Sequence, residues 1–126
     1  MKRALIAAGI LIVMCISFTF FLIQIRDAYS ELQTLADQTA RDAAGDDWES
    51  TFSSAEKLGD AWNRRKDLLL RFLGHDQTDP VEISIARVNE LVRQKNSSDL
   101  LVELSELSIN IRRIWSSEAL SIENMF

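Results

Sequence analysis

The sequence contains few residues that interrupt a helix. Among its 126 residues there are one proline, Pro80, and four glycines. Clean alternation between apolar and polar side chains, as in a half-buried strand, is confined to short stretches such as 81–85 and 108–112. Because helix breakers are scarce and this alternation is rare, strands are disfavoured and we expect an all-α fold.

Cysteine and histidine are also scarce, with one of each. Cys15 lies in an apolar run, so no disulfide can form within the rest of the chain. There is no glycine-rich phosphate loop, no Cys-x-x-Cys pair, no nucleophile elbow and no metalloprotease motif. A Ser-His-Asp site could use only His75, and the spacing selects neither Ser54 nor Ser84 as its nucleophile. We therefore expect no enzymatic activity.

Charged residues are absent from Ala4 to Ile25. This run of 22 residues would extend roughly 33 Å as a helix, close to the ~30 Å hydrocarbon core of a bilayer. We predict a transmembrane anchor in residues 1–25, followed by a helical domain in residues 26–126.

Two other interpretations of this run are open. A signal peptide could be cleaved near Ala28-Tyr29-Ser30, although its apolar core should be only about 7–15 residues long. A lipoprotein could carry its lipid on Cys15, although Met14 stands where a small residue is needed. We favour an uncleaved anchor over both.

The charges on the two sides of the run differ. Lys2 and Arg3 precede it, whereas Arg26 follows it beside Asp27. Because positive charges next to a span tend to stay in the cytoplasm, we predict a cytoplasmic N-terminus and an extracytoplasmic domain at the cell membrane. From Arg26 onward 12 basic residues accompany 19 acidic ones, which argues against a nucleic-acid partner.

Helical periodicity predicts four helices. The first continues the anchor without a joint, because apolar and small residues at spacings of three and four run from Leu22 to Ala43. It should end at Ala44-Gly45, where glycine suits a helix C-terminus. The second should cover about Asp47 to Leu73, with Asp46 or Asp47 as its cap.

The third helix should run from about Pro80 to Lys95. Asp79 suits its N-cap, Pro80 suits the first helical position, and Glu82 suits the acid position of a capping box. The fourth should run from about Ser98, its cap, to Trp115, and a short tail would follow.

The apolar faces of these helices predict two helical hairpins packed as a bundle of about four helices. The two helix–turn–helix units echo each other, so a tetratricopeptide-like repeat is a weaker alternative. The expected core comprises Leu22, Ile25, Tyr29, Leu32, Ala36, Thr39 and Ala43; Trp48, Phe52, Ala55, Leu58 or Gly59, Trp62, Leu69 and Phe72; Val81, Ile83, Ile85, Val88, Leu91 and Val92; and Leu100, Leu101, Leu104, Leu107, Ser108, Ile111, Ile114 and Trp115.

One cluster could bind a small ligand or a metal. If the third helix began early, His75, Asp79 and Glu82 would share a face at spacings of four and three, and an imidazole with two carboxylates can hold a divalent cation. Acids also gather at helix N-termini for capping reasons, and Pro80 favours a helix start at its own position. We therefore expect no metal site and no cofactor.

Other residues are candidates for contact with a partner. Trp48 and Trp62 are expected in the core, although tryptophan is also enriched at binding hot spots. Arg64 and Arg65 belong to a short basic run that is expected to be solvated, although it could contact an acidic partner or a phosphate.

The C-terminal tail ends in apolar side chains, which is unusual unless they are buried. We expect Ile122, Met125 and Phe126 to fold back on the bundle, with Asn124 bonding the backbone. Recognition of the free C-terminus is the alternative.

Several segments together are similar to those of one bacterial family. They are Trp62, His75, Glu82-x-Ser84-x-Ala86-Arg87, Leu104-x-Glu106-Leu107 and the ending Leu120-Ser121-Ile122-Glu123-Asn124-Met125-Phe126. The chain resembles the family called domain of unknown function 4363 (DUF4363) over essentially its whole length.

This resemblance implies an anchored helical protein of Gram-positive, spore-forming bacteria and no established activity, and Arg87 of its motif joins the interaction candidates. Many members carry a second histidine followed by Ile-Pro near the end of the last helix. Here Arg113-Ile114-Trp115 stands in that place, so a ligand held by two histidines is not expected.

The sequence thus predicts a membrane-anchored, non-catalytic interaction module with a protein or another envelope component as its partner. A domain that senses a small ligand or a metal near His75 is the alternative, and a hydrolase of unrecognised type is a third hypothesis. Gly9, Ser17 and the stripe from Leu22 to Ala43 could also let two anchors pack as a homo-oligomer.

Overall fold

The computed structural model describes the backbone of residues 1–125 and their side chains, except those of Phe72, Trp115 and residues 117–125. Four helices follow one another along the chain: α1 (Lys2–Ala44), α2 (Trp48–Leu73), α3 (His75–Arg93) and α4 (Ser97–Met125). No strand occurs in residues 1–125. The predicted all-α fold is confirmed.

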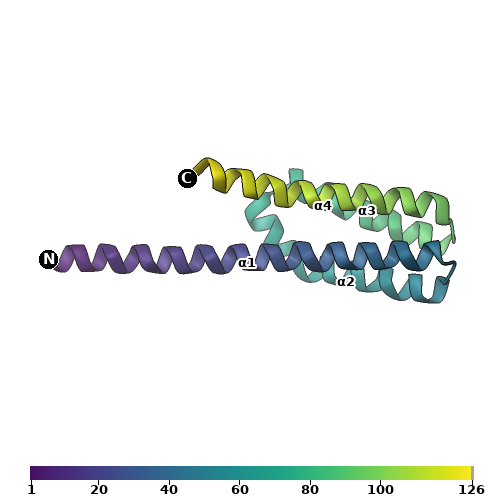
Figure 1. Ribbon diagram of the computed structural model, residues 1–126, viewed down its shortest axis with the longest axis horizontal. Coiled ribbons are helices and arrows are strands. Elements are labelled where there is room, and N and C mark those ends of the chain that lie inside the picture. Colours follow the sequence, from purple (N-terminus) through teal and green to yellow (C-terminus); the bar gives the residue numbers. More distant parts are fainter. Residues whose placement is uncertain (126) are drawn as a thin grey trace.

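The helices form an up-down-up-down bundle (Figure 1). Each helix packs mainly on its two neighbours in a cycle, so α1 and α3 both lie between α2 and α4. The turns 45–47 and 94–96 lie at one end, called here the distal end, and Gly74 joins α2 to α3 at the opposite, proximal end. Because consecutive helices are antiparallel neighbours in one closed bundle, the two hairpins do not form a solenoid.

The two halves of α1 have opposite surroundings. Every residue from 1 to 20 is exposed, and this half projects alone beyond the proximal end (Figure 1). The first fully buried side chain is Ile25, and the buried positions then recur at spacings of three and four as far as Ala43. The predicted unbroken helix ending at Ala44-Gly45 is confirmed, because one periodic stripe suffices to pack its second half on α2 and α4.

The two distal turns have the same backbone structure. Asp46 and Lys95 occupy the left-handed region, with φ of 57° and 53°. In each turn the three successive backbone N–H groups donate to carbonyls four, three and five residues earlier, each at 3.1 Å. These bonds satisfy carbonyl groups at the C-terminal end of the preceding helix.

The residue after each left-handed position caps the next helix. Asp47 Oδ1 accepts from the Ser50 N–H and Asn96 Oδ1 accepts from the Asp99 N–H, both at 3.2 Å. The predicted cap Asp47 is confirmed. The predicted cap Ser98 is wrong, because Asn96 takes that role at the position equivalent to Asp47.

The two hairpins also bury equivalent positions. A shift of 49 residues places turn 45–47 on turn 94–96. The same shift relates buried residues on α1 to buried residues on α3, and residues on α2 to residues on α4. The pairs are Leu32 and Val81, Ala36 and Ile85, Thr39 and Val88, Ala43 and Val92, Thr51 and Leu100, Ser54 and Glu103, Ala55 and Leu104, Leu58 and Leu107, and Trp62 and Ile111.

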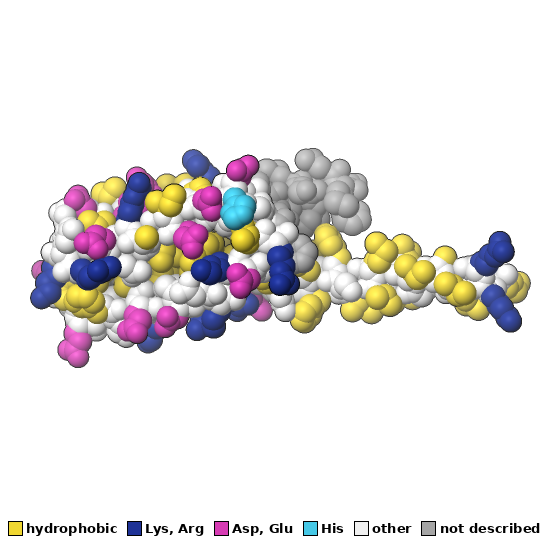
Figure 2. Space-filling view, turned by 180° about the vertical axis from the view of Figure 1, so that it is seen from behind, with side chains coloured by type: hydrophobic (Ala, Val, Ile, Leu, Met, Phe, Trp, Pro, Cys, Tyr) yellow, Lys and Arg dark blue, Asp and Glu magenta, His cyan; other side chains and the backbone are white. Residues whose placement is uncertain are grey.

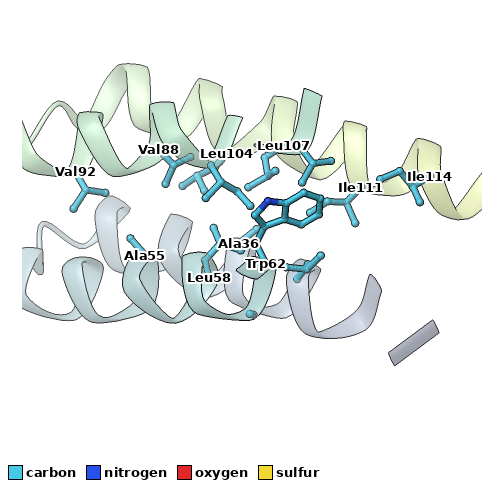
Figure 3. Packing of buried hydrophobic residues seen from close by; sticks show 14 of the residues in the cluster. Ala36, Ala55, Leu58, Trp62, Val88, Val92, Leu104, Leu107, Ile111 and Ile114 are labelled. Carbon is cyan, nitrogen blue, oxygen red and sulfur yellow. The ribbon is translucent and has the colours of Figure 1, made fainter. Parts of the chain in front are cut away.

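Trp62 lies in the middle of the core. Figure 3 shows its indole ring beside Leu104, Leu107 and Ile111 of α4. Two residues that were expected in the core are on the surface instead, since Phe52 is 42% exposed and Ile83 is 52% exposed. The small polar residues beside them in the sequence, Thr51 in α2 and Ser84 in α3, are buried instead.

The predicted start of the third helix is wrong. α3 begins at His75, Gly74 with φ of 78° precedes it, and Pro80 lies inside the helix. The early turn forms because Thr78 is buried against the core and its Oγ1 donates to the Gly74 carbonyl at 3.0 Å. Pro80 lacks an N–H, so the Asp76 carbonyl loses its intrahelical donor.

The predicted end of the fourth helix at Trp115 is also wrong. The backbone remains helical to Met125, and Figure 1 shows these last turns running past the Gly74 end in the direction of the projecting half of α1. The expected separate tail is therefore a continuation of α4. The predictions for the Asn124 and Phe126 side chains lie outside the part of the molecule that the structure describes.

Candidate functional site

Glu103 is a carboxylate that the bundle buries to 8% exposure. Ser84 on α3 donates its hydroxyl to Glu103 Oε1 at 2.9 Å. Arg87, one turn further along α3, approaches the same oxygen with Nη1 at 3.9 Å. Ser84 and Arg87 of the Ser-x-Ala-Arg segment thus both contact one acid on the neighbouring helix.

An open groove of about 420 Å³ surrounds this acid between α3 and α4. Its lining comprises Arg87, Glu90, Leu91, Asp99, Val102 and Glu103. The Val102 side chain is 60% exposed, so an apolar surface lies next to three carboxylates and one guanidinium. This α3–α4 groove could receive an apolar side chain flanked by a basic or amide group.

The equivalent place in the first hairpin has different chemistry. Ser54 stands at the position of Glu103 and donates to Asp42 Oδ2 at 2.6 Å. The position of Val102 is taken by Ser53, which is polar and exposed. The first hairpin therefore offers no apolar residue where the α3–α4 groove offers Val102.

Arg64 and Arg65 contact one acid on α1. Their Nη2 atoms lie 2.6 and 3.0 Å from the two oxygens of Glu31. Partial burial would raise the pKa of Glu31, but the hydrogen bonds from Arg65 and Arg64 outweigh it and hold the pKa below its usual value. The two guanidiniums thus join α2 to α1, and Arg64 also lines an open groove of about 500 Å³ there.

The two tryptophans with described side chains are packed to different extents. Trp48 is half-buried against the edge of the core, and Trp62 is 3% exposed inside it. The indole Nε1 of Trp62 has no hydrogen-bond partner among the described residues. A buried donor without an acceptor costs stability, so Trp62 contributes through its ring and not through its N–H.

The His75 cluster is only partly assembled. Because α3 begins early, His75 Nδ1 lies 3.6 Å from Asp79 Oδ1, but both side chains are mainly exposed. The Glu82 carboxylate instead lies 3.8 Å from Lys66 Nζ. Within the part of the chain that the structure describes, no three His, Cys, Asp or Glu side chains are grouped to hold a metal ion.

Sequence reasoning did not single out Glu31, Asp42 or Glu103. Glu103 has a signal of its own, because it follows Leu100 by three residues and precedes Leu107 by four, which places it on the apolar face of α4. Glu31 and Asp42 have no comparable signal, since their partners lie on another helix.

Residues 19–125 match the family described as "Domain of unknown function (DUF4363)". No curated protein and no solved structure matches the chain. The match covers all four helices apart from the first part of α1. The chain therefore belongs to the DUF4363 family.

Proposed function

We propose that this protein is a membrane-anchored, non-catalytic interaction module that holds its bundle outside the cytoplasm and receives a segment of a partner protein in the α3–α4 groove. The observation that carries the proposal is the division of α1 into an exposed apolar half and a buried half within one unbroken helix. Such a helix fixes a binding domain at a bilayer surface without a flexible linker.

The anchor is supported by the composition and surroundings of α1. By length and composition this helix could cross a membrane, and none of its most apolar stretch is buried within the bundle. Large apolar side chains such as Leu5, Ile12 and Phe20 are more than half exposed. An exposed apolar surface of this kind marks a region that contacts lipid or another protein.

The non-catalytic role is supported by the surroundings of the possible reactive groups. His75 contacts Asp79 at the proximal end, and no hydrogen bond joins it to Ser54 or Ser84 among the described side chains. Those two hydroxyls are donated to carboxylates instead. A nucleophilic serine is commonly activated by a histidine base within hydrogen-bond reach, and neither serine has such a histidine among the described side chains.

Membrane extraction tests the anchor. The full chain should remain with membranes at alkaline pH, and the double variant Ile12→Arg, Ile16→Arg should move to the soluble fraction because charges at the centre of a span are costly. The matched control is Phe52→Arg with Ile83→Arg, which places the same charges on exposed apolar residues of the bundle. Release of the control, or retention of the anchor variant, would contradict the proposal.

Protease digestion of a C-terminal tag tests the orientation. If the domain is extracytoplasmic, the tag should be cut on intact cells. Cleavage only after lysis would place the domain in the cytoplasm and would contradict the charge-based prediction.

Site-specific photo-crosslinking tests the groove. A crosslinker at Val102 should capture a partner segment, whereas one at the equivalent exposed position Ser53 should not. The adduct should disappear when Asp99→Lys repels the basic or amide group expected beside Val102. Equal capture from both positions, or an adduct insensitive to Asp99→Lys, would show that the groove is not the binding surface.

A further inference from the structure

The charges of the bundle are divided along its axis. The proximal end, formed by residues 26–31, 62–80 and 110–125, has seven basic and seven acidic side chains, a net charge of zero. The rest of the bundle, residues 32–61 and 81–109, has five basic and 12 acidic side chains, a net charge of −7. The chain is acidic overall, but its proximal end carries no excess of acidic residues.

Four arginines at the proximal end are exposed and have no ion pair or hydrogen bond among the described side chains. We call this group the basic collar, and it consists of Arg26, Arg71, Arg112 and Arg113. Arg26 and Arg112 line one groove between α1 and α4, and Arg71 lies in the last turn of α2. The cationic surface therefore involves three helices.

The comparison between hairpins explains why Arg113 has no ion pair among the described side chains. The shift of 49 residues relates Arg64 to Arg113 and relates Glu31, the partner of Arg64, to Pro80. Pro80 and Arg113 line one small hollow together with Asp76, but proline offers no carboxylate. The second hairpin thus keeps the cation without an acid at the position of Glu31, and no ion pair joins Arg113 to Asp76 among the described side chains.

The collar surrounds the point where α1 leaves the bundle. Arg26 directly follows Ile25, the first fully buried residue of α1, and the exposed apolar half precedes it. Figure 2 shows the apolar stretch projecting from one end of the bundle, with Lys and Arg side chains near that end as well as along the rest of the bundle. If the stretch spans a bilayer, Arg26 lies at the membrane surface directly after it, and Arg112 lines the same groove as Arg26.

We propose that the basic collar binds the anionic headgroups of the bilayer in which α1 is anchored, so that the bundle stands on the membrane with its acidic distal end outward. This inference depends on the anchoring proposed above. Lipid phosphates suit exposed guanidiniums, which form paired hydrogen bonds with them. The acidic remainder of the bundle is repelled by the same surface, which favours a single orientation.

Lipid selectivity of the full chain in bilayers tests this inference. The protein is reconstituted with Lys2→Gln and Arg3→Gln, which removes the basic residues at the other membrane surface. Spin-labelled phosphatidylglycerol and phosphatidylcholine then report which lipid the protein immobilises. We expect a preference of about five-fold or more for phosphatidylglycerol, the size produced by one arginine near an anionic surface. The preference should fall toward parity at 1 M salt, an added condition at which the screening length is only about 3 Å.

Two triple variants with the same change in charge identify the surface. Arg71→Gln, Arg112→Gln, Arg113→Gln should lower the preference to no more than the part that Arg26 retains, whereas Arg41→Gln, Lys57→Gln, Lys95→Gln at more distal positions should leave it unchanged. An equal loss in both variants, or no loss in the first, would overturn the collar. Immobilised lipid without headgroup preference would overturn only the collar, whereas no immobilised lipid of either kind would overturn the anchor itself.

Discussion

The two hairpins share their turns and the register of their cores but differ in how they use polar residues. In the first hairpin Glu31 joins Arg64 and Arg65, and Asp42 accepts from Ser54 near the surface. In the second, Glu103 is buried beside Ser84, while Arg113 forms no ion pair among the side chains that the structure describes. Equivalent backbone positions thus hold paired charges in the first hairpin, and in the second they hold a buried acid and a cation without an ion pair among the described side chains.

This difference shows which features belong to the scaffold. The left-handed turn residue, the following cap and the nine equivalent buried pairs recur, so they stabilise any hairpin of this kind. Charged contacts do not recur, so they are the features in which one hairpin can acquire a binding role. Substitutions at equivalent positions can separate these two contributions.

The largest effect is expected at the core pair Trp62 and Ile111. Trp62→Ala should lower the free energy of unfolding by about 3–5 kcal/mol, and Ile111→Ala by about 2–5 kcal/mol, because each leaves a cavity. Trp62→Phe should cost much less than Trp62→Ala, since the indole N–H has no acceptor to lose. Urea unfolding of the full chain in detergent, followed by circular dichroism, measures these differences. A Phe variant as unstable as the Ala variant would refute this account.

The next effect is expected at the pair Ser54 and Glu103. Glu103→Ala should cost about 1–3 kcal/mol, because it leaves the buried Ser84 hydroxyl without its acceptor. Ser54→Ala should cost only about 0.5–1.5 kcal/mol, since Asp42 is half-exposed and can bond water. The same unfolding measurement applies, and the double variant Ser84→Ala, Glu103→Ala should cost less than the two single costs combined.

A smaller effect of opposite sign is expected at the turns. Lys95→Gly should stabilise the chain by about 0.5–1 kcal/mol, because lysine is strained at positive φ, although glycine's greater freedom in the unfolded chain offsets part of the gain. Asp46→Gly should gain less, since aspartate tolerates this conformation. If Asp46→Gly raised the free energy of unfolding more than Lys95→Gly, backbone strain at positive φ would not be the cause of the stabilisation.

The smallest effect concerns the pH dependence of the Glu31 contacts. A carboxyl whose pKa is lowered by folding contributes stability above its unfolded value, here 4.5, and loses that contribution as pH falls through the folded value. Glu31→Gln should therefore cost under about 1 kcal/mol at neutral pH and nothing at the acid end, because such exposed pairs are weak. Thermal melts from neutral to acid pH measure this stability difference. Arg113→Gln, which removes a cation without an ion pair among the described side chains, serves as the control.

Much of the fold could be predicted because local rules decide it. The stripe from Ile25 to Ala43, the turn at Gly45 and the cap at Asp47 depend on neighbouring residues alone. The predicted start of α3 was wrong because local rules favour Pro80 at the first helical position. Burial of Thr78 against other helices instead extends the helix toward its N-terminus. The predicted end of α4 was wrong because the apolar periodicity stops at Trp115, whereas the helical backbone continues to Met125.

By itself the sequence determined the helical class, an apolar stretch long enough to cross a membrane, and the hairpin register, since periodicity and turn residues act over a few positions. Only the tertiary structure decided which charges are paired. It places Ser84 and Arg87 in contact with Glu103. It also pairs Glu31 with Arg64 and Arg65, and it brings Arg71 and Arg112 to the end of the bundle where Arg26 lies. These residues are far apart in the chain, and only the packing of antiparallel helices brings such side chains together.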